Sequence, residues 1–254
     1  MFERTRPARH PELMRVSEFQ RYLEELEAAA SRIGRDGPIS KPRWGAIGAS
    51  MRADLQRPKG GEVDEPLEVM ASCVRHGKRV TIHLRCEEFA VPVTLFPTEA
   101  LLHCPEDLLE FVYTHLSSVS VLMVEPAMLR PPGADELPAA GAPKLHHRLT
   151  SVLWKLATRG LRRTLLPEIA GPAAFRIAPG LDVGGLALTT AEAAAVYRLR
   201  RESATVRTIA EWPGFDRLHA VCLLNGLYLQ SGLIVSRSHP SAIRDSWFTG
   251  IVSR

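Results

Sequence analysis

Apolar positions near the start of the chain recur at helical spacing, which predicts one long amphipathic helix over residues 13–34. Because an apolar stripe is normally buried against another surface, we expect this helix to pack on the rest of the chain or to pair with a second copy of it. Residues 35–65 are rich in Gly, Pro and basic side chains and are expected to be irregular. The stripe consists of Val16, Phe19, Leu23, Leu26, Ala30 and Ile33.

Residues 66–130 change between helical and alternating patterns, which predicts a compact α+β unit. Val80, Ile82 and Leu84 alternate with polar residues, as in a half-buried strand. The composition then shifts to the Pro, Ala and Gly of a linker over 131–143. The expected order before that linker is a helix over 66–76, a turn at Gly77 and Lys78, strands at 80–85 and 91–95, a helix over 106–116 and a strand over 119–124.

The segment 181–235 predicts three short helices followed by a strand. Thr189 with Glu192 has capping-box spacing, and Thr205 and Asp216 are good caps for the second and third helices. We expect Gly232 to end the third helix in a left-handed conformation, before a strand over 233–235. This order is typical of a winged helix, a module that reads DNA in some proteins and binds proteins in others.

The predicted fold class is therefore α+β, with a small mixed α/β unit followed by a helical region that ends in a winged-helix-like module. We expect four stretches: an N-terminal amphipathic helix and irregular segment over 1–65, the α+β unit over 66–130, the linker over 131–143 and the helical region over 144–254.

The third predicted helix of the last segment decides between DNA and protein as the partner. A helix that reads base edges presents several polar side chains to the major groove. Arg217, His219 and Asn225 are the candidates, but leucines and other apolar residues occupy most other positions. A helix this apolar is largely buried, so we favour a structural or protein-docking use over DNA reading.

Charge is unevenly distributed along a chain whose formal net charge is +4. Residues 62–110 hold ten acidic and four basic side chains, whereas residues 144–201 hold ten basic and three acidic ones. Two basic clusters are candidate surfaces for an acidic partner, unless they are ordinary solvated faces or complement the acidic segment. The first cluster, expected along one face of a helix, is Lys155, Arg159, Arg162 and Arg163, and the second is Arg198, Arg200 and Arg201.

Nothing in the sequence indicates an active site, and we expect no catalytic, cofactor-binding or metal-binding residues. Motifs of P-loop, dinucleotide-binding, α/β-hydrolase and zinc-protease sites are absent. The four cysteines are far apart and are expected to be buried, reduced thiols. The least favoured alternative is an enzyme in which His83 and His103 converge near Cys86 or Glu87. Without a membrane-spanning run or a secretory signal, we expect a cytoplasmic protein.

Residues 66–235 resemble the PATAN domain family through the segments PLEVMASCVRHGKRVTIHL, VPVTLFPTEALLHCPEDLLEFV, SVSVLMVEPAML, LWKLATRGLRRTLLPEIAG and LALTTAEAAAVYRLR, with TIAEW and LNGLYLQSGLIV. One departure lies at Pro97, Thr98 and Glu99, where the family usually has a glycine turn. The resemblance implies a bacterial signalling adaptor without catalysis. It also implies partners such as a receiver domain, a small GTPase or a motility component.

The expected function is thus a non-catalytic bacterial signalling or regulatory adaptor that binds other proteins, in polarity or motility control. The N-terminal helix is a candidate for homo-oligomer formation. The alternative is a winged-helix transcriptional regulator that binds DNA, with nucleic acid as the less favoured partner.

Overall fold

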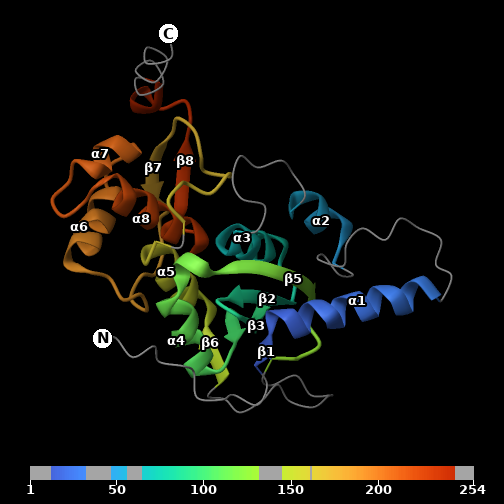
Figure 1. Cartoon of the computed structure of the whole chain (residues 1–254). Helices are drawn as coiled ribbons and strands as arrows, with labels where there is room; N and C mark the ends of the chain where they lie inside the picture. Colours follow the sequence, from blue (N-terminus) through green and yellow to red (C-terminus); the bar gives the residue numbers. More distant parts are fainter. Residues whose placement is uncertain (1–12, 33–46, 56–64, 132–144, 161, 244–254) are drawn as a thin grey trace, which may run out of the picture. The chain divides into compact units, whose positions relative to one another are not determined.

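The computed structural model describes residues 13–32, 47–55, 65–131, 145–160 and 162–243 (Figure 1). The chain divides into two compact units, Met1–Leu149 and Thr150–Arg254, each with helices and antiparallel strands. The fold is mixed α+β, as the sequence predicts. The expected linker lies outside the described residues except for Pro131. No helix within the described ranges is long and apolar enough to cross a membrane.

Six described strands of the first unit form one antiparallel sheet with the order β5-β2-β3-β4-β6, and β1 pairs with β3 (Figure 1). The alternating pattern predicts the two long central strands, and a more continuously apolar run predicts β5. The short strands β1, β4 and β6 carry too few residues to show a pattern. The bounds are β1 Met14–Arg15, β2 Val80–Cys86, β3 Phe89–Phe96, β4 Leu101–His103, β5 Ser120–Pro126 and β6 His146–Arg148.

The two faces of this sheet differ because side chains alternate along each strand. Ile82 of β2 lies opposite Val93 of β3 and Val124 of β5, and all three are buried. On the other face of β2, His83 lies opposite Pro92 and Met123. The first face is therefore aliphatic core, and the second face carries the polar residues of the sheet.

The helix α1, Val16–Arg32, covers part of that second face. Its residue Phe19 packs with Ala90 of β3 and Met123 of β5, and Leu23 lies against the same cluster. The predicted amphipathic helix is thus confirmed, and its first turns pack on the sheet. Nothing is described of the side chains of Leu26 and Ala30, and Ile33 lies outside the described residues.

The other helices of the first unit are α2 Ala49–Leu55, α3 Pro66–His76 and α4 Glu106–Thr114. The start of α3 is capped by the Glu65 carboxylate, which accepts the N–H groups of Leu67 and Glu68, and its end by Gly77 at φ 60°. The helix α2 lies where we expected irregular chain. Two buried side chains, Met51 and Leu55, stabilise this short helix although the local pattern is weak.

The turn that departs from the PATAN pattern still closes a hairpin between β3 and β4. The Ala100 N–H donates to the Pro97 carbonyl at 3.2 Å, and Ala100 takes the left-handed conformation at φ 55°. A glycine is therefore not required at this turn.

The second unit contains the predicted series of helices and a two-stranded sheet. The capping box of Thr189 with Glu192 and the caps at Thr205 and Asp216 all form. The strands β7 and β8 pair antiparallel, and Phe175 of β7 also bridges Ala204. The bounds are α5 Leu149–Thr158, β7 Ala174–Ile177, α6 Thr190–Leu199, α7 Val206–Ala210, α8 Arg217–Leu229 and β8 Leu233–Ser236.

The left-handed residue after α8 is Ser231, at φ 56°, so our expectation for Gly232 is wrong. The sequence favours the glycine because it avoids the steric cost of that conformation. The structure needs Gly232 for another reason: a Cβ there would lie 2.2 Å from a methyl carbon of Leu181.

The helix α8 is buried along most of its length. Leu224 and Leu227 are both fully buried, which confirms that this apolar helix is part of the core. It approaches α5 closely at Gly226, where a Cβ would lie 2.9 Å from ring carbons of the buried Trp154. The glycine therefore sets the distance between the two helices.

We predict that Gly226→Ala lowers the free energy of unfolding by about 1–2 kcal/mol. Because a contact at 2.9 Å forces a neighbouring group to shift, overpacking should cost about 2–3 kcal/mol, the upper part of its usual range, and this exceeds the gain of about 1 kcal/mol in helix propensity. Urea denaturation measures the change. The control is Gly48→Ala, since a Cβ at Gly48 meets nothing within 4 Å. A Gly226→Ala protein as stable as the wild type would contradict the close packing.

Candidate functional site

The first predicted basic surface does not form along a helix. The helix α5 ends at Thr158, and Gly160 at φ 83° turns the chain away. Lys155 is half-buried on α5, Arg159 and Arg163 are exposed beyond it, and the buried Arg162 donates from Nε to the Thr164 carbonyl at 2.9 Å. The helical spacing misled us because it continues past the residue that ends the helix.

The candidate DNA-contacting residues are divided between surface and core. Arg217 and His219 are exposed at the start of α8, where His219 Nδ1 lies 3.0 Å from the carboxylate of its neighbour Asp216. Asn225, by contrast, is fully buried. Its Oδ1 accepts the Leu166 N–H at 2.9 Å, and its Nδ2 donates to the Thr164 carbonyl at 3.0 Å. Asn225 is a structural clamp, and its assignment to base contacts is wrong.

An exposed aromatic and basic surface lies on α6 and on the turn that follows it. Tyr197 is 58% exposed, and the Arg201 guanidinium lies over its ring at 4.8 Å from the centroid. One turn earlier, Ala193 and Ala194 are also exposed. Small residues beside a large aromatic ring let another surface approach closely. We call Ala193, Ala194, Tyr197 and Arg201 the α6 surface.

The three arginines of the second predicted basic cluster have different roles. Arg198 lies over the Trp212 ring at 4.3 Å and pairs with Glu202 at 3.3 Å. Arg200 donates to the Leu181 carbonyl at 2.8 Å. Both therefore stabilise the unit itself. Arg201 contacts the exposed Tyr197, so it is the arginine best placed for a partner.

The polar face of the first unit's sheet carries a His–carboxylate pair. His83 Nε2 donates to Glu125 Oε1 at 2.8 Å, and the Phe19 ring lies over the imidazole with centroids 4.7 Å apart. The convergence of His83 with His103, the least favoured of our alternatives, is not seen: His83 pairs with Glu125, and the ring of His103 on β4 contacts that of His146 on β6. Sequence reasoning missed Glu125, since only the pairing of β5 with β2 brings it to His83.

A pocket of about 210 Å³ opens beside the His83–Glu125 pair. It lies between α1 and the polar face of the sheet. Its polar side chains are His83, Glu125 and the hydroxyl of Tyr22, and none of its lining residues is serine, threonine, cysteine or lysine. The lining residues are Met14, Phe19, Tyr22, His83, Ala90, Pro92, Met123 and Glu125.

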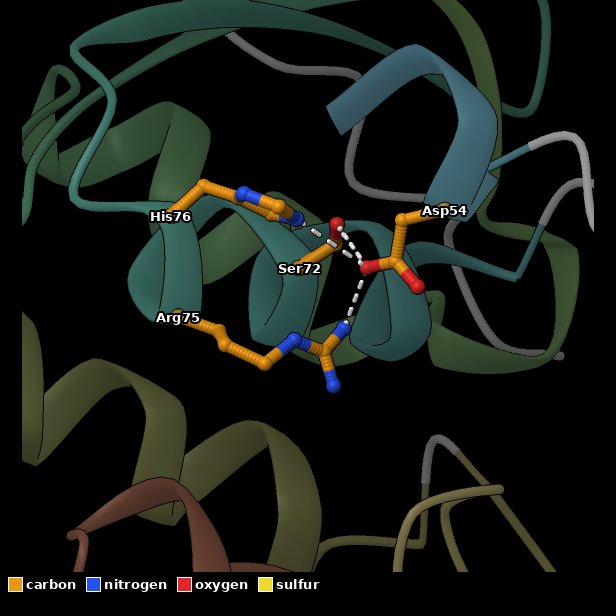
Figure 2. A network of polar contacts seen from close by, with 4 residues as sticks. All are labelled: Asp54, Ser72, Arg75 and His76. Atoms are coloured by element: carbon orange, nitrogen blue, oxygen red, sulfur yellow. Dashed lines mark hydrogen bonds and ion pairs between the residues drawn. The ribbon is translucent and has the colours of Figure 1, made fainter. Parts of the chain in front are cut away.

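A second polar network joins α2 to α3 (Figure 2). Asp54 Oδ2 accepts from Ser72 Oγ at 2.8 Å and Arg75 Nη2 at 2.6 Å, and lies 3.4 Å from His76 Nε2. These residue types resemble a catalytic triad, but Ser72 is fully buried and donates to the aspartate rather than to the histidine. The network is therefore an anchor for α2.

All four cysteines are buried thiols, as predicted. Burial raises the pKa of Cys86 and of Cys104 to about 12, with smaller contributions from the negative charges of Glu87 and Asp107 respectively. Burial likewise raises the pKa of Cys222 to about 11 and that of Cys73 well above its usual range. Such thiols are poor nucleophiles because little thiolate is present near neutral pH.

Within the described residues, no group of three or more His, Cys, Asp or Glu side chains is arranged to hold a metal ion. Comparisons with protein-family models, with curated proteins and with solved structures found no match for this chain. The case for a function therefore rests on the surfaces described above.

We predict that Asn225→Ala lowers the free energy of unfolding by about 2–4 kcal/mol. The change leaves the buried Leu166 N–H without its acceptor, at a cost of about 1–3 kcal/mol, and adds a cavity. Thermal denaturation, with Arg217→Ala as the exposed control on the same helix, measures the loss. Equal stability of the two variants would mean that Asn225 is exposed after all.

The raised thiol pKa values predict a loss of stability at alkaline pH. Above the ordinary thiol pKa of 9.0 the unfolded chain releases thiol protons, whereas the folded protein holds that of Cys104 up to about 12. Each such thiol therefore contributes stability that is present below pH 9 and is lost as the pH rises towards 12. Denaturant unfolding from pH 8 to pH 11 should show a shallower decline for Cys104→Ala than for the wild type. Identical declines would refute this assignment.

Proposed function

We propose that this chain is a non-catalytic adaptor in bacterial signalling or regulation, and that it binds an acidic surface of another protein through the α6 surface. The observation that carries this proposal is the exposed Tyr197 with Arg201 over its ring. Tyrosine and arginine are the side chains that most often dominate binding energy at protein interfaces. A tyrosine ring this exposed contributes little to folding, which supports a role in binding a partner.

The chemistry of the α6 surface favours an acidic partner. Arg201 is exposed, and Arg198 and Arg207 are exposed nearby in the sequence, although each of these two pairs with a glutamate four residues on. Exposed cations speed the approach of an acidic surface, and the ring supplies apolar contact once the surfaces meet. A receiver domain, a small GTPase or a motility component is the kind of partner that the PATAN resemblance implies.

We further propose that the second unit is a winged-helix-like module used for protein docking. In support, α6, α7 and α8 follow one another with formed caps and lead into β8. The strand β8 pairs with β7, which precedes α6, rather than with a strand that follows it.

DNA reading is the weaker alternative for this module. A recognition helix must present several polar side chains to the bases. On α8, Asn225 is buried, and Arg217 and His219 lie together at the first turn only, beside the negative charge of Asp216. The third helix therefore offers a short and partly neutralised polar patch.

The helix α1 supports a second mode of association, with another copy of the chain. Tyr22 is 48% exposed on α1, with its ring centroid 6.4 Å from that of Phe19. A homo-oligomer through the exposed side of α1 would use none of the residues of the α6 surface.

We predict that Arg201→Glu weakens partner binding about tenfold or more, because it reverses a charge and removes the contact over Tyr197. Affinity purification from the host, followed by titration of the recovered partner, measures the loss. The matched control is Arg159→Glu, which makes the same charge change at another exposed arginine. Both variants should keep their melting temperatures, since exposed ion pairs contribute about 0–1 kcal/mol.

Two outcomes would contradict the proposal. If Arg159→Glu weakens binding and Arg201→Glu does not, the docking surface is the segment after α5. If the recovered partner binds both variants as tightly as the wild type, neither basic cluster is the docking surface.

A further inference from the structure

We propose that the pocket between α1 and the polar face of the sheet binds a small organic cation with an alkylammonium group, which Glu125 and the faces of Phe19 and Tyr22 hold together. The proposal concerns the first unit alone and does not rest on the adaptor function. No residue of this pocket belongs to the α6 surface.

The pocket combines one carboxylate with aromatic and thioether walls. The Tyr22 and Phe19 rings have centroids 6.4 Å apart, and Phe19 in turn lies over His83. Glu125 joins this series of contacts through its hydrogen bond to His83. These contacts form a continuous path from an exposed ring to a carboxylate. The remaining wall is apolar and consists of Met14, Ala90, Pro92 and Met123.

Glu125 has the capacity to bind a second group. Its side chain is 34% exposed, and among the described residues His83 is the partner that holds its carboxylate, through Oε1. The carboxylate can therefore accept from a ligand through Oε2. Glu125 is the one acidic side chain among the eight residues that line the pocket, and its carboxylate supplies the formal negative charge there.

The sign of this charge selects the class of ligand. None of the eight lining residues is lysine or arginine, so an anion would meet the carboxylate without a counter-charge. A neutral apolar ligand would displace water from the carboxylate without replacing the hydrogen bonds that this water made. An alkylammonium ion offers a positive charge to Glu125 and to the ring faces, and it offers methyl groups to the apolar wall.

The size of the pocket selects a small ion. Sites for drug-sized ligands usually enclose about 300–1,000 Å³, whereas this pocket holds about 210 Å³. That volume suits a group of the size of choline. The half-exposed Tyr22 ring stands at the edge of the pocket, where it can close over such a group from the solvent side.

The test uses choline and its uncharged carbon isostere, 3,3-dimethyl-1-butanol, at pH 8 and matched ionic strength. Backbone NMR signals of the full chain are followed during titration. We expect choline to shift the signals of Tyr22 and Ala90 in a saturable way, and the neutral isostere to bind at least about tenfold more weakly.

Variants distinguish a loss of binding through the carboxylate from a loss of binding through unfolding. Glu125→Gln keeps the shape of the side chain and should weaken choline binding about tenfold, and Tyr22→Ala should weaken it several-fold. Glu211→Gln, an exposed residue of the second unit, makes the same charge change and should have no effect. Circular dichroism melting shows whether each variant is folded, and the exposed Tyr22 keeps the test available if Glu125→Gln unfolds.

Three outcomes would overturn the proposal. The first is that the folded wild type does not bind choline in a saturable way. The second is that the neutral isostere binds as tightly as choline. The third is that folded Glu125→Gln binds choline as tightly as the wild type. In the second case, the pocket is an apolar site and the charge plays no part.

Discussion

The burial of α8 is the constraint on which the second unit depends. Its buried amide side chain, Asn225, holds the segment around Leu166, and its glycine, Gly226, admits the ring of Trp154 from α5. At the end of the helix, Gln230 donates to the Thr150 carbonyl at 3.1 Å. Two consecutive parts of the chain, α5 and the segment around Leu166, therefore close on one helix, and a buried amide that is hydrogen-bonded through both its oxygen and its nitrogen fixes their register.

Because α8 is buried, other surfaces are better candidates for binding a partner or a ligand. In a DNA reader the third helix is presented to the groove, but here it supplies the core, and we propose that the exposed side of α6 with Tyr197 and Arg201 binds the partner instead. The first unit has its own opening, beside His83 and Glu125. An aromatic ring stands at both places, and we propose one for an acidic protein surface and the other for a small cation.

Local signals in the sequence predicted much of the fold. The alternation through Val80 and Ile82, and the caps at Thr189 and Asp216, each act within a few residues and each formed as expected. Errors arose where a distant contact decides. Only the packing of Met51 reveals α2. The end of α5 is different, because Gly160 marks it locally and the spacing of the basic residues led us to extend the helix past it.

The candidate sites were harder to predict because each depends on tertiary pairing. No local pattern connects His83 to Glu125, which are 42 residues apart and meet through β2 and β5. Composition alone did not separate Arg201, which is exposed, from Arg162, which is buried. The polar residue Asn225 looked like a surface contact for the same reason.

Hydrogen–deuterium exchange across α8, with and without duplex DNA at low salt, tests the central claim most directly. If α8 is the core of the second unit, its amides around Asn225 exchange as slowly as global unfolding of that unit allows, and DNA leaves them unchanged. Rapid exchange along α8 in the free protein, slowed when DNA is added, would contradict the account and identify α8 as a DNA-reading helix.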